Sequence, residues 1–142
     1  MAVRILAVAF AGFLVLIVVL ANQGRLYDYV PDPTQYPGGD KICHFFLMGT
    51  MAMLANMSFY GAAIPFGRRR IFLGSALVFL FVAGEEFSQL YVEGRSFDWV
   101  DLTADVLGIM VLGSLGGRLA VKKRMRKKIR PVKVDGNEVS TL

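Results

Sequence analysis

Apolar residues gather in four long runs along the chain, and polar residues separate them. The runs cover about residues 4–21, 42–60, 71–91 and 100–120, so each holds about 18 to 21 residues. Because about 20 residues of α-helix cross the roughly 30 Å hydrocarbon core of a bilayer, each run is long enough for a membrane helix. The pattern therefore predicts an all-α membrane protein built as a four-transmembrane-helix bundle.

The four runs form one predicted domain, residues 1–121, which a basic tail follows at 122–142. An outer loop at 22–40 is rich in proline and glycine, so we expect it to be irregular. The first run could instead be a signal peptide, since residues 19–21 loosely fit a small-residue cleavage site. Its apolar stretch is longer than the usual core of a signal peptide, which favours a retained helix.

Composition supports the membrane class. Hydrophobic residues make up 55% of the chain, and its mean hydropathy is positive. A soluble core of this size does not need so much apolar surface. The single cysteine, Cys43, excludes an internal disulfide. The basic run 122–128 directly follows a predicted membrane helix, which favours membrane lipids as partners and argues against nucleic acid. We expect the tail after Pro131 to be disordered.

Charge predicts the orientation of the bundle. Segments 22–41 and 85–105 together carry three basic and nine acidic residues. The rest of the chain carries thirteen basic and two acidic residues. Because basic residues remain on the cytoplasmic side of a membrane, we expect both termini to be cytoplasmic and the acidic segments to lie outside.

Two adjacent glutamates, Glu85 and Glu86, follow an apolar stretch within the third run. A carboxylate inside a membrane segment is costly unless it has partners, so such residues are usually functional. Helical rise puts both glutamates at the depth of Asp101 and Asp105 in the antiparallel fourth helix. We therefore expect Glu85 to approach Asp101 within hydrogen-bond or one-water distance, and Glu85→Gln to impair function more than folding.

Two predicted helix starts add polar residues to this cluster. We expect Asp40 to cap the second helix, with Lys41 and His44 a turn apart on one face. We expect Asp98 to cap the fourth helix, with Asp101 approximating a capping box. A purely structural network of caps and interhelical hydrogen bonds is the alternative to a binding site. It explains the aspartates better than the two deep glutamates.

Small residues recur along the fourth run. Gly113 and Gly117 have the spacing of a close-approach motif. We expect them to pack against another helix of the same chain rather than to form a dimer, and the oligomeric state stays open.

Three motifs stand in order along the chain: Asp40-Lys41-x-x-His44-Phe45, Glu85-Glu86-x-x-Gln89 and Gly94-Arg95-Ser96-Phe97-Asp98-x-x-Asp101. They resemble the VanZ-like family, small membrane proteins whose founding member is linked to low-level teicoplanin resistance. The resemblance covers about residues 40–117. It implies a bacterial inner-membrane protein with a four-helix core and a link to the cell envelope, but no particular reaction. The family tends to have Ala-Asn where this chain has Ala104-Asp105.

The resemblance implies a ligand-binding site, the charge pattern puts it on the extracytoplasmic face, and Asp105 joins it by position. The site residues are Asp40, Lys41, His44, Glu85, Glu86, Gln89, Arg95, Asp98, Asp101 and Asp105. The leading hypothesis is that the site binds or modifies an envelope amphiphile, such as a lipid-linked cell-wall precursor or a lipoglycopeptide. Lys41 and Arg95 would bind an anionic head group.

A membrane-embedded enzyme acting on a lipid-linked substrate is the main alternative, so whether the chain is an enzyme stays open. The catalytic candidates are His44, Glu85, Glu86 and Asp101. A divalent ion could be held there, but the spacing matches no recognised metal signature, so we predict neither metal nor cofactor. A proton-coupled transporter is a third option, which the lack of intramembrane charge on the cytoplasmic side disfavours.

Overall fold

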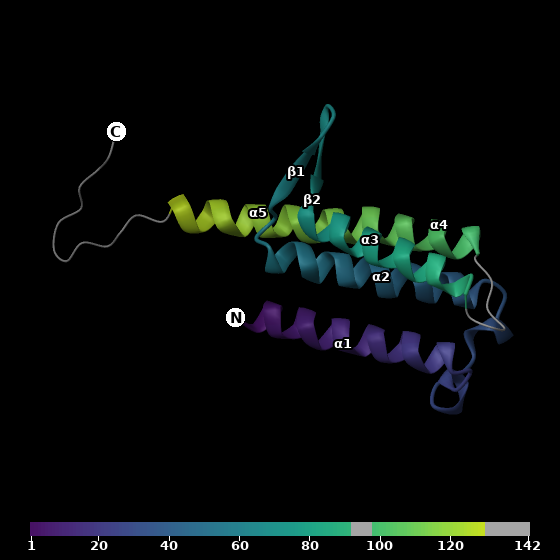
Figure 1. Ribbon diagram of the computed structural model, residues 1–142. Coiled ribbons are helices and arrows are strands. Elements are labelled where there is room, and N and C mark those ends of the chain that lie inside the picture. The colour runs from purple at the N-terminus through teal and green to yellow at the C-terminus, as the bar shows by residue number, and fades with distance from the viewer. Residues whose placement is uncertain (92–97, 130–142) are drawn as a thin grey trace, which may run out of the picture.

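The computed structural model describes residues 1–91 and 98–129, and most of them are helical (Figure 1). The helices are α1 (Ala2–Asn22), α2 (Gly39–Ser58), α3 (Leu73–Gln89), α4 (Trp99–Gly108) and α5 (Ser114–Ile129), with the π-helical turn η3 (Ile109–Gly113) between the last two. Because η3 keeps the helical path, α4, η3 and α5 together make the single fourth helix that the hydrophobic pattern predicts.

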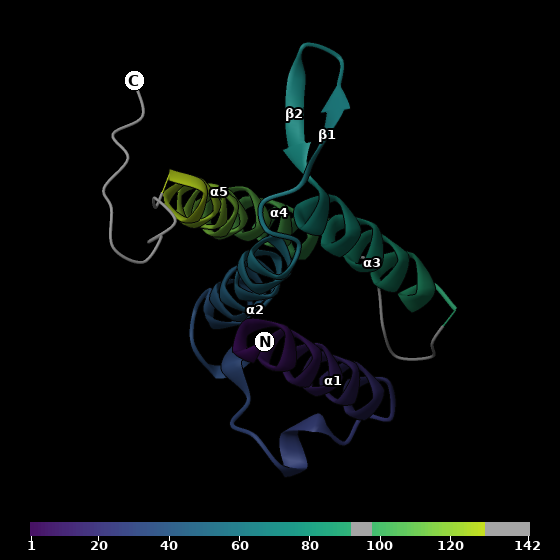
Figure 2. The same cartoon turned by 90° about the vertical axis from the view of Figure 1, so that its left-hand side faces the viewer.

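The central helix of the bundle is α2. It packs against α1 on one side and against α3, α4, η3 and α5 on the other. Figure 2 shows α1 across α2 from the remaining helices. The connection from α1 to α2 carries two short 3-10 turns, η1 (Leu26–Asp28) and η2 (Pro33–Gln35), so this loop is irregular as expected.

Two of the described helices are long and apolar enough to cross a membrane. They are α1 and the continuous stretch Trp99–Lys127. The other two fall short, since α3 has 17 residues and α2 carries Asp40, Lys41 and His44 in its first two turns. Two apolar helices suggest a membrane protein, and passage of all four helices through the bilayer stays a prediction.

Small residues let the helices approach closely around α2. The apolar core consists of Ala52, Ala55, Val78, Val82 and Ile109. A Cβ atom on Gly108 would clash with the backbone oxygen of Phe45, and one on Gly117 would meet the ring of Phe72. Gly113 faces Ser75 and Ala52 in the same way. Gly113 therefore packs against two other helices of the chain, as predicted, whereas Gly117 packs against Phe72, the residue that precedes α3.

A buried amide joins three helices at the middle of the bundle. Asn56 is fully buried, and its Nδ2 donates hydrogen bonds to Ser75 Oγ at 2.7 Å and to the Gly113 carbonyl at 2.8 Å. The Ser75 N–H donates to Asn56 Oδ1 at 3.0 Å. Gly113 belongs to η3, where the wider π-helical turn changes the regular hydrogen-bond pattern. The network fixes α2, α3 and η3 to one another.

The third helix begins at Leu73 rather than at residue 71, because a β-hairpin precedes it. Strands β1 (Ala63–Phe66) and β2 (Arg69–Phe72) pair antiparallel, with Phe66 opposite Arg69. Gly67 holds the first position of the two-residue turn with a φ of 57°, a conformation that favours glycine. The hairpin projects from the bundle beside the start of α3 (Figures 1 and 2).

The fourth helix also runs further than predicted. It extends to Ile129, so the first part of the basic tail is helical rather than separate from the bundle helix. Lysine and arginine are good helix formers, and they are favoured in the last turns of a helix. The expected disorder after Pro131 lies outside the described residues.

Candidate functional site

Several of the most deeply buried side chains of the described fold are polar. The largest side chains that are fully buried are Glu86, Asn56 and Asp105, each at most 1% exposed. Glu86 and Asp105 lie beside His44, and one ligand atom from each of the three lies within 4.8 Å of the others. Burying two carboxylates is costly unless they are paired or hydrogen-bonded. Packing alone does not explain why the fold keeps them there.

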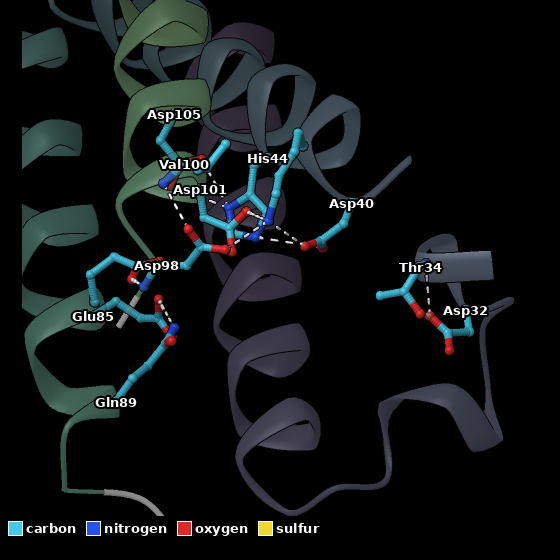
Figure 3. Close-up of polar contacts among 12 residues, drawn as sticks. Asp32, Thr34, Asp40, His44, Glu85, Gln89, Asp98, Val100, Asp101 and Asp105 are labelled. Atoms are coloured by element: carbon cyan, nitrogen blue, oxygen red, sulfur yellow. Dashed lines mark hydrogen bonds and ion pairs between the residues drawn. The ribbon is translucent and has the colours of Figure 1, made fainter. Parts of the chain in front are cut away.

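Lys41 bridges the starts of two helices. Its Nζ donates hydrogen bonds to Asp40 at 3.2 Å, to Asp98 at 3.0 Å and to Asp101, and Figure 3 labels these three aspartates. Lys41 and Asp40 belong to the first turn of α2, whereas Asp98 and Asp101 belong to the start of α4. Aspartates are favoured at helix N-termini, and one ammonium group draws these two N-termini together. Three carboxylates surround that one cation, so the net charge of this group is negative.

Asp98 caps α4, as predicted. Its Oδ1 accepts a hydrogen bond from the Val100 N–H at 2.7 Å. The Lys41 ammonium, and then this backbone bond, lower the pKa of the Asp98 carboxyl below its usual value. Asp98 therefore favours the charged form that both interactions need.

Asp40 does not cap α2, so that prediction is wrong. The cap position belongs to Gly38, which has a φ of 72°, so the helix begins at Gly39 and already includes Asp40. Asp40 instead lies in the first turn and turns its carboxylate toward side chains, with Oδ1 3.9 Å from His44 Nε2. It thus links the Lys41 group to His44.

His44 and Asp105 form a close pair between α2 and α4. His44 Nδ1 lies 3.1 Å from Asp105 Oδ1 and 3.3 Å from Oδ2. In a neutral histidine this geometry places the proton on Nδ1, where it is donated to Asp105, and leaves Nε2 as an acceptor. The pair therefore has the arrangement in which a carboxylate orients a histidine for binding or proton transfer.

The two adjacent glutamates take different places. Glu86 is buried and accepts a hydrogen bond from the Asp98 N–H at 3.4 Å, which links α3 to the start of α4. Glu85 is half-buried, and both of its oxygens accept from Gln89 Nε2, at 2.9 and 2.8 Å. The glutamate that groups with His44 and Asp105 is therefore Glu86, and the approach of Glu85 to Asp101 stays a prediction.

Two groups of side chains have the composition of a cation site. One is Asp40, His44 and Asp101, and the other is His44, Glu86 and Asp105. Lys41 already bonds to Asp40 and Asp101 in the first group, so its ammonium group supplies the positive charge there. In the second group Asp105 already engages His44 Nδ1. In both groups, side chains that could hold an ion already contact one another.

An apolar cavity of about 310 Å³ lies beside this cluster. Asp40, His44 and Glu85 form its polar wall. The remaining wall comes from α1, the loop after it and α2: Leu14, Ile17, Val18, Ala21, Leu26, Tyr27, Val30, Pro31, Pro33, Cys43, Leu47 and Met48. The cavity wall thus combines apolar surface with a few hydrogen-bonding groups, which suits an amphiphilic molecule.

All predicted site residues within the described chain lie at one end of the bundle (Figure 3). They form three connected groups: Lys41 with Asp40, Asp98 and Asp101; His44 with Asp105 and Glu86; and Glu85 with Gln89. Arg95 lies outside the described residues. The cavity wall was not predicted, because apolar residues of a helix facing a cavity follow the same pattern as those facing lipid.

No curated protein and no solved structure matches the chain significantly. The family model VanZ/LLP1 matches residues 5–116, which include every described residue of the cluster and of the cavity wall. The match stops within α5, before its basic end. The order of the motifs, the joined starts of α2 and α4 and this match agree, and the chain belongs to the VanZ/LLP1 family.

Proposed function

We propose that this chain is a multi-pass bacterial inner-membrane protein that binds an amphiphile of the cell envelope. The apolar part of the ligand occupies the cavity between α1, its following loop and α2, and the polar part contacts Asp40, His44 and Glu85. One observation carries the proposal: Asp40, His44 and Glu85 of the polar cluster line a largely apolar cavity. Two apolar helices and the family membership support a membrane location.

The charge of the cluster narrows the class of head group. Lys41 is bonded to three aspartates, so an anionic head group would have to displace a carboxylate to reach it. Acceptors dominate the cavity wall, since Asp40 and Glu85 line it with His44. Hydroxyl, amide and ammonium groups donate hydrogen bonds to such acceptors. The ligand class is therefore a glycosylated or amine-bearing amphiphile, such as a lipid-linked wall precursor or a lipoglycopeptide. The link to teicoplanin resistance rests on the family name.

The charge pattern supports an extracytoplasmic site. The acidic cluster lies at one end of the bundle, and the basic residues of α5 lie at the other. With both termini cytoplasmic, the cluster faces outward. Cysteine labelling tests this: a probe at Gln35 reacts from outside, and a probe at Lys133 reacts only after permeabilisation. The reverse labelling pattern contradicts an outward-facing site.

Mass spectrometry of the lipids that purify with the protein tests the binding proposal. Val18 lines the cavity, whereas Val15, on the same helix, is 50% exposed and is absent from the cavity wall. Val18→Trp fills the cavity, and Val15→Trp makes the same chemical change outside it. We expect the wild type and Val15→Trp to retain the same amphiphile and Val18→Trp to lose most of it. Equal retention by both variants excludes this cavity as the site.

A second function, a hydrolase or transferase acting on the bound amphiphile, is favoured by the His44–Asp105 pair. Asp105 orients His44, and Nε2 remains available toward the Asp40 side of the cavity. His44 would then act as a general base on a ligand hydroxyl or on water. Incubating the purified protein with a lipid-linked precursor tests this activity. Product that forms with the wild type and falls by about 100-fold in Asp105→Asn, with ligand retention unchanged, supports an enzyme; an unaltered precursor supports binding alone.

A further inference from the structure

A second cavity lies at the opposite end of the bundle from the acidic cluster. It has a volume of about 1190 Å³ and lies between the start of α1 and the ends of α2 and α5. Figure 1 places the N-terminus of the chain and α5 at this end, away from the start of α4. The proposed amphiphile site therefore does not include it.

Basic side chains dominate the polar part of this cavity. Six of them line it: Arg4, Lys122, Lys123, Arg124, Arg126 and Lys127. No aspartate or glutamate is among the described residues of the wall. Six positive charges without a lining acid repel one another, so a bound anion is favoured there.

The remaining wall is apolar or has unused hydrogen-bonding capacity. Val3, Met57, Phe59 and Leu119 provide an apolar surface. Ser58 Oγ is buried and has no hydrogen-bond partner among the described residues, and Ser58 also lines the cavity. A buried hydroxyl without a partner is uncommon, because the group loses its hydrogen bonds to water. The wall thus combines a basic region, an unused donor and a surface for hydrocarbon.

Arg4 is held in position by an aromatic ring. Its Cζ lies 5.1 Å from the centre of the Tyr60 ring, and both residues line the cavity. This cation–π contact stabilises the guanidinium on the α1 side, opposite the basic residues of α5. Arginine in this setting suits bidentate contact with a phosphate group.

We propose that this cavity binds one anionic phospholipid, with its phosphate between Arg4 and α5 and part of an acyl chain against Val3 and Leu119. The apolar surface favours a lipid over a free phosphate ion. Arg4 and the α5 basic residues fall outside residues 5–116, which the family model matches. The lipid would join the first and last helices, which have few direct contacts with each other.

Native mass spectrometry in nanodiscs of defined lipid tests the proposal. The nanodiscs contain phosphatidylcholine either alone or mixed with phosphatidylglycerol. The test variant changes Arg4, Lys122 and Arg126 to Gln, and the control changes Arg68, Arg69 and Arg70 to Gln. Both variants remove three positive charges, but the control residues lie in or beside the hairpin and outside the cavity wall.

We expect the wild type and the control to retain one phosphatidylglycerol after transfer to detergent, and the test variant to retain about tenfold less or lower. If the two variants lose phosphatidylglycerol equally, the site is overturned, because any basic cluster would then retain the lipid. Retention of phosphatidylcholine to the same extent also overturns it. In a separate experiment, inorganic pyrophosphate is added in place of the lipid. If pyrophosphate stabilises the protein as much as phosphatidylglycerol does, a lipid is rejected as the occupant.

A folding defect in the test variant does not leave the question open. The wild-type protein is then labelled with a phosphatidylglycerol carrying a photoreactive head group. Adducts on residues 57–60 or 119–127 support the site. Adducts confined to the hairpin contradict it.

Discussion

The side chain of His44 on α2 is joined to Asp105 on α4, with His44 Nδ1 3.1 Å from Asp105 Oδ1. Asp105 is 1% exposed, and Glu86 from α3 lies beside the same pair. The pair therefore stands where three helices meet, next to the cavity that His44 lines. The His44–Asp105 pair therefore connects the buried polar network to the cavity, which a ligand can enter.

Lys41→Met should destabilise the protein by about 1–2 kcal/mol. The change leaves Asp40, Asp98 and Asp101 close together without their cation. Lys41 is 33% exposed, so solvent screens part of this repulsion and the cost stays below that of a fully buried pair. Unfolding in detergent measures the change. Adding Asp101→Asn to Lys41→Met should recover part of the loss, and no recovery would mean that the carboxylates do not interact.

Asp98→Asn should cost most stability at neutral pH and progressively less in acid. Asparagine keeps the helix cap, so the variant removes mainly the charge that Lys41 binds. Because the folded-state pKa of Asp98 is lowered, the carboxylate contributes stability above its unfolded pKa of about 3.9, and that contribution disappears as pH falls through the folded pKa.

The measurement is the difference in Tm between wild type and Asp98→Asn from pH 6 down to pH 2.5. We expect the difference to shrink below about pH 4. In a Lys41→Met background the difference should be small at every pH. A difference that does not depend on pH in the wild-type background contradicts the Lys41–Asp98 interaction.

The sequence predicted the helices well because apolar runs of this length have few alternatives. It also brought residues of three separate motifs to one end of the bundle, because helical rise and antiparallel order are simple geometry. It missed the hairpin, since a four-residue apolar strand such as Ala63–Phe66 gives too short a pattern to separate from a loop. It placed the cap of α2 on Asp40, because side-chain preference for a cap did not anticipate the left-handed backbone of Gly38.

The sequence did not specify which of the two glutamates groups with His44 and Asp105. Adjacent helical residues point about 100° apart, so only one of Glu85 and Glu86 can face α4 directly. The rotation of α3 decides which one, and that rotation depends on packing at Val78, Val82 and the buried amide network. Nothing in the local sequence specifies this angle.

Glu85→Gln should reduce ligand retention and change the free energy of unfolding by less than about 0.5 kcal/mol. Glu85 is half-buried on the cavity wall, and glutamine keeps its volume while removing its charge. Glu86→Gln is the comparison, because Glu86 is 1% exposed and losing a buried charge should hold or raise Tm. Copurified lipid and Tm are measured on both variants. If Glu85→Gln retains as much copurified lipid as the wild type, the cluster has a structural role.

Gly108→Ala should destabilise the protein by about 2 kcal/mol and weaken the His44–Asp105 pair. A Cβ there would meet the backbone oxygen of Phe45, which cannot move aside as a side chain can, so α4 must shift away from α2. Gly84→Ala is the control, since its Cβ would meet nothing within 4 Å and alanine favours the helix. A Tm in Gly108→Ala equal to or above that of Gly84→Ala would contradict this close packing.

The most direct test of the central claim is photo-crosslinking from inside the cavity in living cells. A small aliphatic amino acid that carries a diazirine, and so leaves the cavity open, is placed at Val18, on the cavity wall, or at Val15, on the exposed face of α1, and the adducts are identified by mass spectrometry. The account predicts that Val18 captures one amphiphile with a hydroxyl-, amide- or amine-bearing head group, while Val15 captures bulk phospholipids. The same mixture of bulk phospholipids at both positions would contradict a specific amphiphile site.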